Sequence, residues 1–161
     1  MKKLKIYIDA CVIGNLDEQG YPQDMAEAHA LWEMIKAGEF HVVISEVALN
    51  EINDNKNQIK VKILSNYLSE IKFEQLALDD EIEHIADLVK QSGLIPSDKK
   101  LNDRRHIGGA LVSRADILVS TNFKDLVNVN TVMGVKKIST VEGYGSIDIF
   151  PPSMLINKGG K

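Results

Sequence analysis

The sequence contains only one cysteine, Cys11, among its 161 residues. A single cysteine cannot form an intramolecular disulfide, and it cannot supply the set of thiolates that a structural zinc site needs. A reducing cytoplasm is therefore the compartment that we expect. The apolar stretch near the first residue is short and is broken by Asp9, so it does not predict a signal peptide, and no apolar run approaches the length of a membrane helix.

Glycine-rich phosphate-binding motifs are also missing. The sequence has no G-x-G-x-x-G and no Walker loop, which argues against an enzyme that uses a nucleotide cofactor. The formal net charge is −4, so the surface as a whole does not attract nucleic acid. Any binding of nucleic acid must therefore rest on a local basic patch.

The composition that remains is that of a folded globular protein. Hydrophobic residues make up 44% of the chain and charged residues 26%, which favours a real core and argues against disorder. No internal repeat, low-complexity tract or interdomain linker interrupts the sequence. We therefore expect one domain over residues 1–150, followed by a C-terminal tail at residues 151–161.

Strand-like and helix-like patterns alternate along the chain. Strands are predicted at residues 2–9, 40–44, 73–78 and 116–120, with less regular candidates near 135–138 and 147–150. Helices are predicted from Asp24 to Gly38, onward from an N-cap at Ser45, over about 59–68, from 79 or 80 to Gly93, and over about 103–113. This alternation indicates parallel βαβ units, which carry their sites beyond the carboxyl ends of the strands.

Three acidic residues occupy positions from which they can meet at that edge of the sheet. Asp9 follows the first strand, Glu51 lies two turns into the helix after the second strand, and Asp103 opens a later helix. Each also has a structural explanation as a cap, a surface charge or a partner of the helix dipole. Carboxylates crowded together repel one another unless a cation is present, and ligand sets made only of oxygen favour Mg²⁺ or Mn²⁺. Such an ion supports hydrolysis of a phosphodiester.

Two adjacent glycines in the later helix, Gly108 and Gly109, support the meeting of these acids. Each glycine costs a helix about 1 kcal/mol relative to alanine. The cost makes sense where the helix backbone packs closely on the sheet. Close packing there brings Asp103 beside Asp9.

The segments around the acids resemble the PIN-domain family, which includes the VapC-type toxins of toxin–antitoxin systems. Residues 6–14 are similar to the opening block of the family, and residues 43–52 to its "Ser-x-x-Thr/Ala-x-x-Glu" helix. Residues 103–111 and 115–122 resemble the later blocks. The blocks follow one another in the family order from residue 4 to about residue 128.

The resemblance implies a three-layer α/β/α domain with a central parallel sheet and a ribonuclease site that depends on Mg²⁺ or Mn²⁺. Asp9, Glu51 and Asp103 fall on the first three acidic positions of the family, as metal ligands. At the fourth position Phe123 stands where many members have an acid. Asn122 is then the fourth catalytic candidate through its carbonyl oxygen, and Asp125 replaces it if the loop shifts.

A run of basic residues surrounds Asp103. It can be a solvated helix start, or it can hold the phosphate backbone of RNA beside the acids. Both interpretations stay open. The candidate RNA-binding residues are Lys100, Arg104, Arg105 and Lys124.

The sequence thus favours a metal-dependent endoribonuclease that hydrolyses RNA phosphodiester bonds, similar to a VapC toxin. The resemblance also implies an antitoxin protein as a partner and a homodimer. The alternative is a degenerate PIN domain that binds RNA or a protein without cutting. A phosphatase of the haloacid dehalogenase type is disfavoured, because that family needs Asp-x-Asp after its first strand and residues 9–11 read Asp-Ala-Cys.

Overall fold

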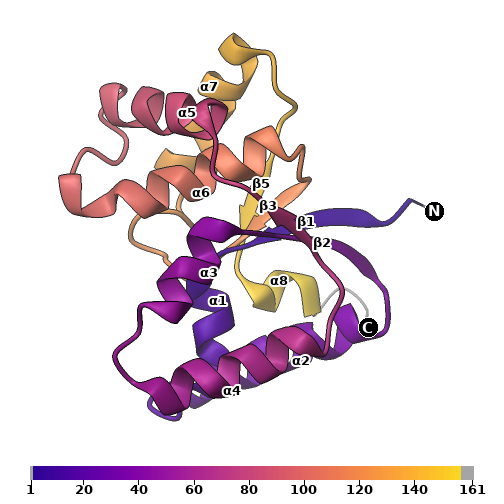
Figure 1. The fold of residues 1–161 in the computed structure, drawn as a ribbon. Helices are drawn as coiled ribbons and strands as arrows, with labels where there is room; N and C mark the ends of the chain where they lie inside the picture. The colour runs from indigo at the N-terminus through magenta and orange to yellow at the C-terminus, as the bar shows by residue number, and fades with distance from the viewer. Residues whose placement is uncertain (1, 157–161) are drawn as a thin grey trace.

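A five-stranded parallel sheet organises the computed structural model, which describes residues 2–156 (Figure 1). The strand order is β3-β2-β1-β4-β5, so β1 lies at the centre. The chain extends the sheet to one side of β1 and then crosses over to build the other side. The strands are β1 (Leu4–Ile8), β2 (Phe40–Ser45), β3 (Glu74–Leu76), β4 (Ile117–Val119) and β5 (Asp148–Phe150).

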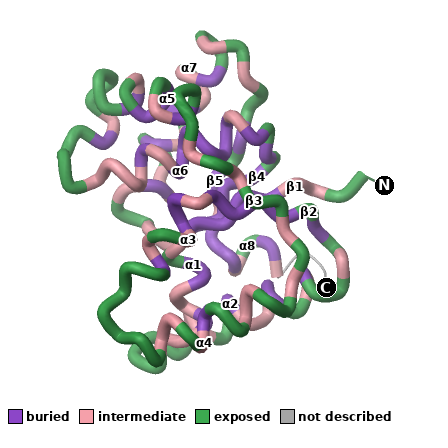
Figure 2. The backbone as a smooth tube through the Cα atoms, viewed as in Figure 1, coloured by how far each residue is buried: buried purple, intermediate pink, exposed green. Residues whose placement is uncertain are grey.

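Helices cover both faces of the sheet, because alternate strand residues point to opposite sides and both sets are apolar (Figure 2). Ile6 and Ile8 point into one core, and Tyr7 points into the other. The first core is covered by α1 (Ala10–Gly14), α2 (Pro22–Lys36), α3 (Glu46–Asn53), α4 (Gln58–Ser69) and α8 (Pro152–Ile156). The second is covered by α5 (Asp80–Gln91), α6 (Leu101–Val112) and α7 (Val129–Glu142).

Short polar signals set the ends of several helices. The Ser45 hydroxyl accepts a hydrogen bond from the Ala48 N–H (3.2 Å), so the predicted N-cap of α3 is confirmed. Gly38 and Gly93 follow α2 and α5 with φ of +83° and +81°, a backbone region that glycine adopts without strain. Two 3₁₀ turns, η1 (Asn15–Asp17) and η2 (Asp98–Lys100), link α1 to α2 and lead into α6. Within residues 2–156, no helix is both long and apolar enough to span a membrane.

The paired glycines of α6 allow that helix to approach its neighbours closely. A Cβ atom at Gly109 would lie 2.8 Å from Cε2 of Tyr7 on the central strand. A Cβ atom at Gly108 would lie 2.8 Å from the carbonyl oxygen of Ile82 on α5. The predicted close contact of this helix with the sheet is thus confirmed for Gly109, whereas Gly108 serves the packing of α6 on α5.

The structure differs from the sequence prediction in the last quarter of the chain. Residues 135–138, predicted as a strand, lie inside α7. The predicted tail begins with α8, whose Leu155 is 3% exposed and packs into the first core. The folded domain therefore continues past residue 150. Met1 and residues 157–161, the rest of the predicted tail, lie outside the described residues.

Candidate active site at the carboxyl edge of the sheet

The carboxyl ends of β1 and β4 mark the point where the strand order reverses. Open α/β sheets carry their ligands at this point, because the loops after the two strands diverge there and leave a crevice. Asp9 follows β1 and Ser120 follows β4. The Asp9 carboxylate is 1% exposed, accepts a hydrogen bond from the Val12 N–H (3.1 Å) and bonds to the Ser120 side chain. Asp9 thus caps α1 and also places a buried charge at this edge.

Glu51 reaches the same edge from α3 and is held there by a histidine. Its Oε1 lies 2.7 Å from Nε2 of His106, which is 2% exposed. The other ring nitrogen, Nδ1, lies 2.7 Å from the Tyr7 hydroxyl, which donates in turn to the Ser45 hydroxyl (2.8 Å). A continuous polar chain therefore connects the N-cap of α3, the central strand and α6 to the Glu51 carboxylate. We call Ser45, Tyr7, His106 and Glu51 the histidine relay.

Both ring nitrogens of His106 are engaged in the relay. Nδ1 is bound to the Tyr7 hydroxyl and Nε2 to the Glu51 carboxylate, and the tautomer sets which partner donates. Burial lowers the pKa of His106, but the hydrogen bond with Glu51 and the negative charges of the three acids raise it above its ordinary value overall. Burial also raises the pKa of the Tyr7 hydroxyl, which keeps its proton. The surrounding carboxylates thus favour the protonated form of the imidazole, and burial opposes it.

Asp103 completes the acidic cluster from the first turn of α6. Burial raises its pKa, the charges of His106 and Lys100 act against this effect, and the nearby carboxylates of Asp125 and Glu51 add to it. The pKa of Asp9 is raised as well, chiefly by burial and further by the charge of Asp103. The structure thus gathers the three acids named from the sequence, although they lie far apart in the chain.

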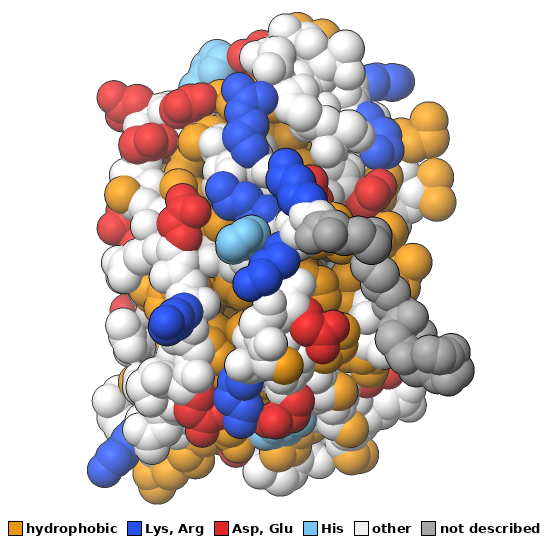
Figure 3. All heavy atoms as spheres, turned by 90° about the vertical axis from the view of Figure 1, so that its right-hand side faces the viewer, with side chains coloured by type: hydrophobic (Ala, Val, Ile, Leu, Met, Phe, Trp, Pro, Cys, Tyr) orange, Lys and Arg blue, Asp and Glu red, His pale blue; other side chains and the backbone are white. Residues whose placement is uncertain are grey.

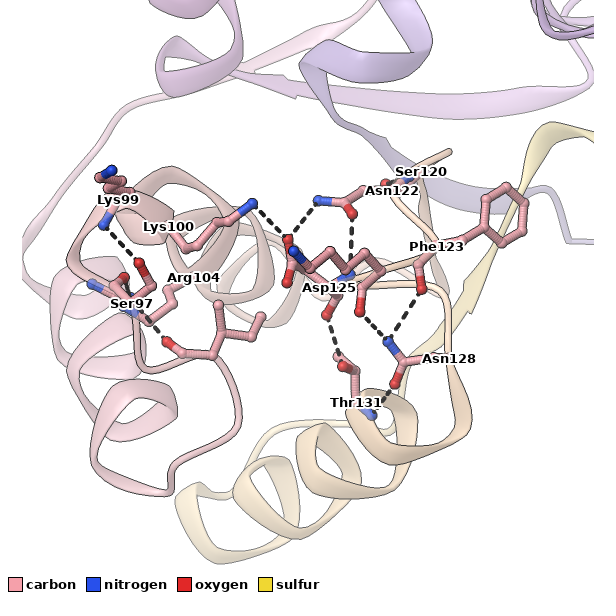
Figure 4. A network of polar contacts seen from close by, with 12 residues as sticks. Ser97, Lys99, Lys100, Arg104, Ser120, Asn122, Phe123, Asp125, Asn128 and Thr131 are labelled. Atoms are coloured by element: carbon pink, nitrogen blue, oxygen red, sulfur yellow. Dashed lines mark hydrogen bonds and ion pairs between the residues drawn. The ribbon is translucent and has the colours of Figure 1, made fainter.

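The loop after β4 carries a fourth acid, Asp125, which lies between Lys100 and Asn122 (Figure 4). The side-chain oxygen of Asn122 accepts the Asp125 N–H (3.0 Å), so it supports the turn. The carboxylate of Asp125 pairs with the Lys100 ammonium (2.9 Å) and adds to the pKa shift of Asp103. Phe123 is 57% exposed, and its ring points away from Asp125. Asp125 is therefore a better candidate for the fourth acid than Asn122.

The basic residues around Asp103 divide into two groups. Arg104 is 3% exposed and donates from Nη1 to the carbonyl oxygens of Ile95 (2.9 Å) and Ser97 (2.6 Å). This corrects the prediction of an RNA contact for Arg104, because a buried guanidinium cannot meet a phosphate. The other predicted contacts reach the surface to different degrees: Arg105 pairs with Glu83 through two hydrogen bonds (2.9 and 2.8 Å), Lys100 pairs with Asp125, and Lys124 is exposed.

The donor atoms of the cluster suit a hard divalent cation. The carboxylates supply only oxygen, which Mg²⁺ and Mn²⁺ prefer. Burial is the main cause that raises the pKa values of Asp9 and Asp103, and neighbouring carboxylates add to it, so a bound cation would stabilise their charged forms. Within residues 2–156, no group of three or more acidic, histidine or cysteine side chains is arranged to hold a metal ion. An open arrangement of this kind fits Mg²⁺, which keeps several waters and uses one or two carboxylates.

The strands and helices form a parallel α/β fold with the sheet order β3-β2-β1-β4-β5. No family model matches the sequence, and a search of curated proteins gives no match. Among solved structures the chain is similar to VapBC2 from Rickettsia felis bound to a DNA fragment from their promoter, with a TM-score of 0.52 and 14% sequence identity. The match covers 92% of this chain and 98% of that chain. The predicted PIN-like α/β fold with a central parallel sheet is thus confirmed.

Proposed function

We propose that this protein is a metal-dependent endoribonuclease that hydrolyses RNA phosphodiester bonds, in the manner of a VapC toxin. The observation that supports the proposal most strongly is that Asp103 interacts electrostatically with Asp9, Glu51 and Asp125 near the switch point of a PIN-like sheet. Gathering carboxylates in a partly buried place costs free energy that a structural role does not require. A site that binds a cation and a phosphate makes use of it.

Asp9, Glu51 and Asp103 would hold Mg²⁺ or Mn²⁺, with Asp125 beside them. When bound, the ion would activate a water molecule and stabilise the charge that develops on the phosphate. The chain itself orients the carboxylates. The N–H of Val12 and the side chain of Ser120 fix Asp9.

His106 has a positioning role in this proposal. It binds Oε1 of Glu51, and among the described residues no hydrogen bond engages the second oxygen, Oε2. The hydrogen bond to Oε1 therefore also fixes the orientation of Oε2, which stays available to a ligand. Tyr7 and Ser45 connect the imidazole to the sheet, so the orientation of Glu51 depends on the fold as a whole.

RNA contacts beyond the cluster rest on two lysines. Lys124 is exposed on the loop after β4, and Lys100 lies beside Asp125. Both stand next to the acids, where a phosphate backbone would pass. An antitoxin partner and a homodimer are further proposals; the similar structure from Rickettsia felis, a VapBC2 complex, supports the first of them.

A non-catalytic PIN-like module is the second candidate, and two ion pairs favour it. Lys100 binds Asp125 at 2.9 Å, and His106 binds Glu51 at 2.7 Å, so cations of the chain itself offset half of the acidic cluster. Such a site can persist without a metal. It would then bind RNA or a protein without cutting.

The deciding experiment is incubation of the purified protein with single-stranded RNA and either Mg²⁺ or Mn²⁺. We expect cleavage by the wild type and its loss in Asp9→Asn and in Asp103→Asn. Asp87→Asn, at an exposed position on α5, is the matched control and keeps full activity. Cleavage that survives both site substitutions would overturn the mechanism, and metal-independent RNA binding without cleavage would favour the non-catalytic module.

A further inference from the structure

A hollow with a volume of about 310 Å³ opens beside the acidic cluster, between α1, α3 and α4. This volume is at the lower end of the range for ligand pockets, which suits a small planar group. Glu51 contributes to the lining, so the hollow and the cluster share a wall. Ala10, Ile52 and Leu64 form an apolar part of the lining. The polar part of the lining includes Asn15, Asn55, Lys60 and Thr121.

The charges on this lining argue against a phosphate as the occupant. Lys60 pairs with Glu18 at 3.1 Å, and its side chain is only 17% exposed. Glu51 adds a further negative charge on the side of the acids. A phosphate in the hollow, in addition to the one at the acids, would therefore be repelled by net negative charge, whereas an uncharged group would not be repelled.

Amides and a hydroxyl supply the hydrogen-bonding groups of the hollow. Asn15 donates from Nδ2 to the Thr121 hydroxyl (2.9 Å), which leaves the Asn15 carbonyl oxygen and the Thr121 hydroxyl proton for a ligand. Asn55 accepts the Asn57 N–H (2.8 Å) through its side-chain oxygen, which leaves its NH₂ group. An acceptor, a hydroxyl donor and an amide donor thus surround an apolar wall. Proteins read the edges and faces of unpaired nucleobases with this combination.

We propose that the hollow binds the nucleobase next to the scissile phosphate. This inference rests on the proposed ribonuclease function, and it narrows the substrate to single-stranded RNA with a preferred base beside the cut. A base in a duplex is stacked and paired, whereas a base in a single strand can turn out into a side pocket. Because Glu51 belongs to both the hollow and the acidic cluster, a base in the hollow would be adjacent to the phosphate at the acids.

Gly14 offers a direct way to fill the hollow. It belongs to the lining, its φ is −59°, and a Cβ atom added to it meets nothing within 4 Å. Gly14→Leu therefore introduces a side chain into open space without backbone strain. Gly145→Leu is the matched control, because a Cβ atom there also meets nothing within 4 Å and Gly145 lies outside the hollow. Asn55→Ala, at an exposed position, tests the same hollow without adding volume.

The first measurement uses metal-free protein, in which cleavage cannot occur. Titration with each of the four ribonucleoside monophosphates is followed by backbone amide NMR signals. We expect shifts at Asn15, Asn55 and Thr121, about tenfold weaker binding for Gly14→Leu and Asn55→Ala, and unchanged binding for Gly145→Leu. Shifts confined to other parts of the chain, or equal binding by all variants, would overturn the proposal.

The second measurement sequences the products that active protein makes from a randomised single-stranded RNA. We expect the wild type and Gly145→Leu to share a base preference at one position beside the cut, and Gly14→Leu to lose it. An unchanged preference in Gly14→Leu would overturn the hollow as a base site while the ribonuclease function stands. If the wild type cuts no RNA with either metal, the ribonuclease function fails, and the metal-free titration still decides whether the hollow binds nucleotides.

Discussion

The two ends of the sheet each carry a hollow, and their properties are opposite. The hollow at the amino end has a volume of about 810 Å³ and is lined by residues such as Lys3, Lys36 and Lys72. Several Lys and Arg side chains lie on this face of the molecule (Figure 3). Some of its charges form pairs near the surface: Lys36 binds Glu33 at 2.8 Å and Glu70 at 3.6 Å. Exposed pairs of this kind contribute little to stability, because water solvates the same charges well.

The carboxyl end has the smaller hollow of the two, of about 310 Å³, but its charges are buried. Asp9 is 1% exposed and His106 is 2% exposed. Burial, with a smaller contribution from neighbouring carboxylates, raises the pKa values of Asp9 and Asp103. Buried charge that is only partly compensated marks this end as the candidate site, whereas volume alone would select the other end. The same type of substitution, made once at each end of the sheet, can test this distinction.

Removal of a histidine from each end should give the largest contrast. His106→Leu removes the hydrogen-bond partner of the Glu51 carboxylate and one of the two partners of the Tyr7 hydroxyl, so we expect a loss of about 2–4 kcal/mol in the free energy of unfolding. We place the upper limit of this range below that of a fully buried ion pair, because the Glu51 side chain is 32% exposed and water can solvate it. His41→Leu, exposed at the amino end, should change stability by less than about 0.5 kcal/mol. Urea unfolding at neutral pH measures the stability of both variants. Equal losses of stability in the two variants would contradict the proposed difference between the two ends.

A double-mutant cycle tests the positioning role of His106 apart from its stability role. If His106 acts on cleavage through Glu51, His106→Leu should lower the cleavage rate in the wild type and much less in Glu51→Gln, with a coupling energy of about 0.5–3 kcal/mol. His106→Gln keeps an N–H donor and should recover part of the rate. Additive effects on the rate would assign His106 to the fold alone.

Addition of metal should give the second largest difference between the ends. A cation that binds only the folded protein stabilises it by about 2.7 kcal/mol at a hundredfold excess over Kd. We expect Mn²⁺ to raise the Tm of the wild type and of Glu70→Gln, a change at the amino end. Asp9→Asn should show little or no rise. Thermal unfolding with Mn²⁺ and with EDTA measures this, and a rise that survives in Asp9→Asn would place the ion elsewhere.

A methyl group at Gly109 should have a smaller effect. The new Cβ atom would meet Cε2 of Tyr7 at 2.8 Å, so α6 must move or Tyr7 must tilt. Overpacking of this kind costs about 1–3 kcal/mol, which exceeds the roughly 1 kcal/mol that alanine gains over glycine in a helix. Gly145→Ala has open space and should be neutral within about 0.5 kcal/mol. Chemical unfolding of the two variants separates these outcomes, and a stabilised Gly109→Ala would contradict the close contact.

Local patterns predicted the frame of this molecule well. The run of apolar residues before Asp9 indicated the central strand, and Ser45 and Gly38 indicated the ends of helices through their own capping chemistry. The topology then placed Asp9 and Glu51 at one edge, because the carboxyl ends of parallel strands share an edge. Each of these inferences uses residues that are neighbours in sequence.

The sequence did not reveal the histidine relay, because its members meet only through long-range packing. His106 lies 99 residues from Tyr7 and 55 from Glu51. One signal was present: His106 stands three residues after Asp103, on the same side of a helix predicted to pack against the sheet. A polar ring at that place must find a partner when it is buried.

The error over α7 has a different cause. Val132, Val135 and Ile138 pack into the second core, but β-branched residues also favour strands, and this led to a strand prediction at 135–138. The capping residues at the two ends of this segment indicate a helix. Asn128 accepts the Thr131 N–H (2.8 Å) as an N-cap, and Gly143 has a φ of +82° as a C-cap. In α8 a proline opens the helix, and proline suits the first turn.

Ion pairs should give the smallest and most pH-dependent contrast between the two ends. The hydrogen bonds from Arg105 to Glu83, and to a lesser extent its charge, lower the pKa of the Glu83 carboxyl, while partial burial acts in the opposite direction. A lowered folded-state pKa means that the pair stabilises the protein above the unfolded pKa of Glu83 and loses this effect as the pH falls through the folded value. Because the Glu83 side chain is 38% exposed, we expect Arg105→Gln to cost less than about 1 kcal/mol at pH 7.

The same pH series should separate this pair from an exposed pair at the amino end. Urea midpoints of the wild type and Arg105→Gln should differ at pH 7 and converge below the unfolded pKa of Glu83, because protonated Glu83 no longer pairs with the guanidinium. Lys36→Gln should match the wild type throughout the series, since the Lys36 pairs are solvated and act between long, mobile side chains. A difference for Arg105→Gln that persists unchanged in acid would mean that Arg105 stabilises α6 through its contact with Asn102 or through packing of its stem, and that its pairing with Glu83 contributes little.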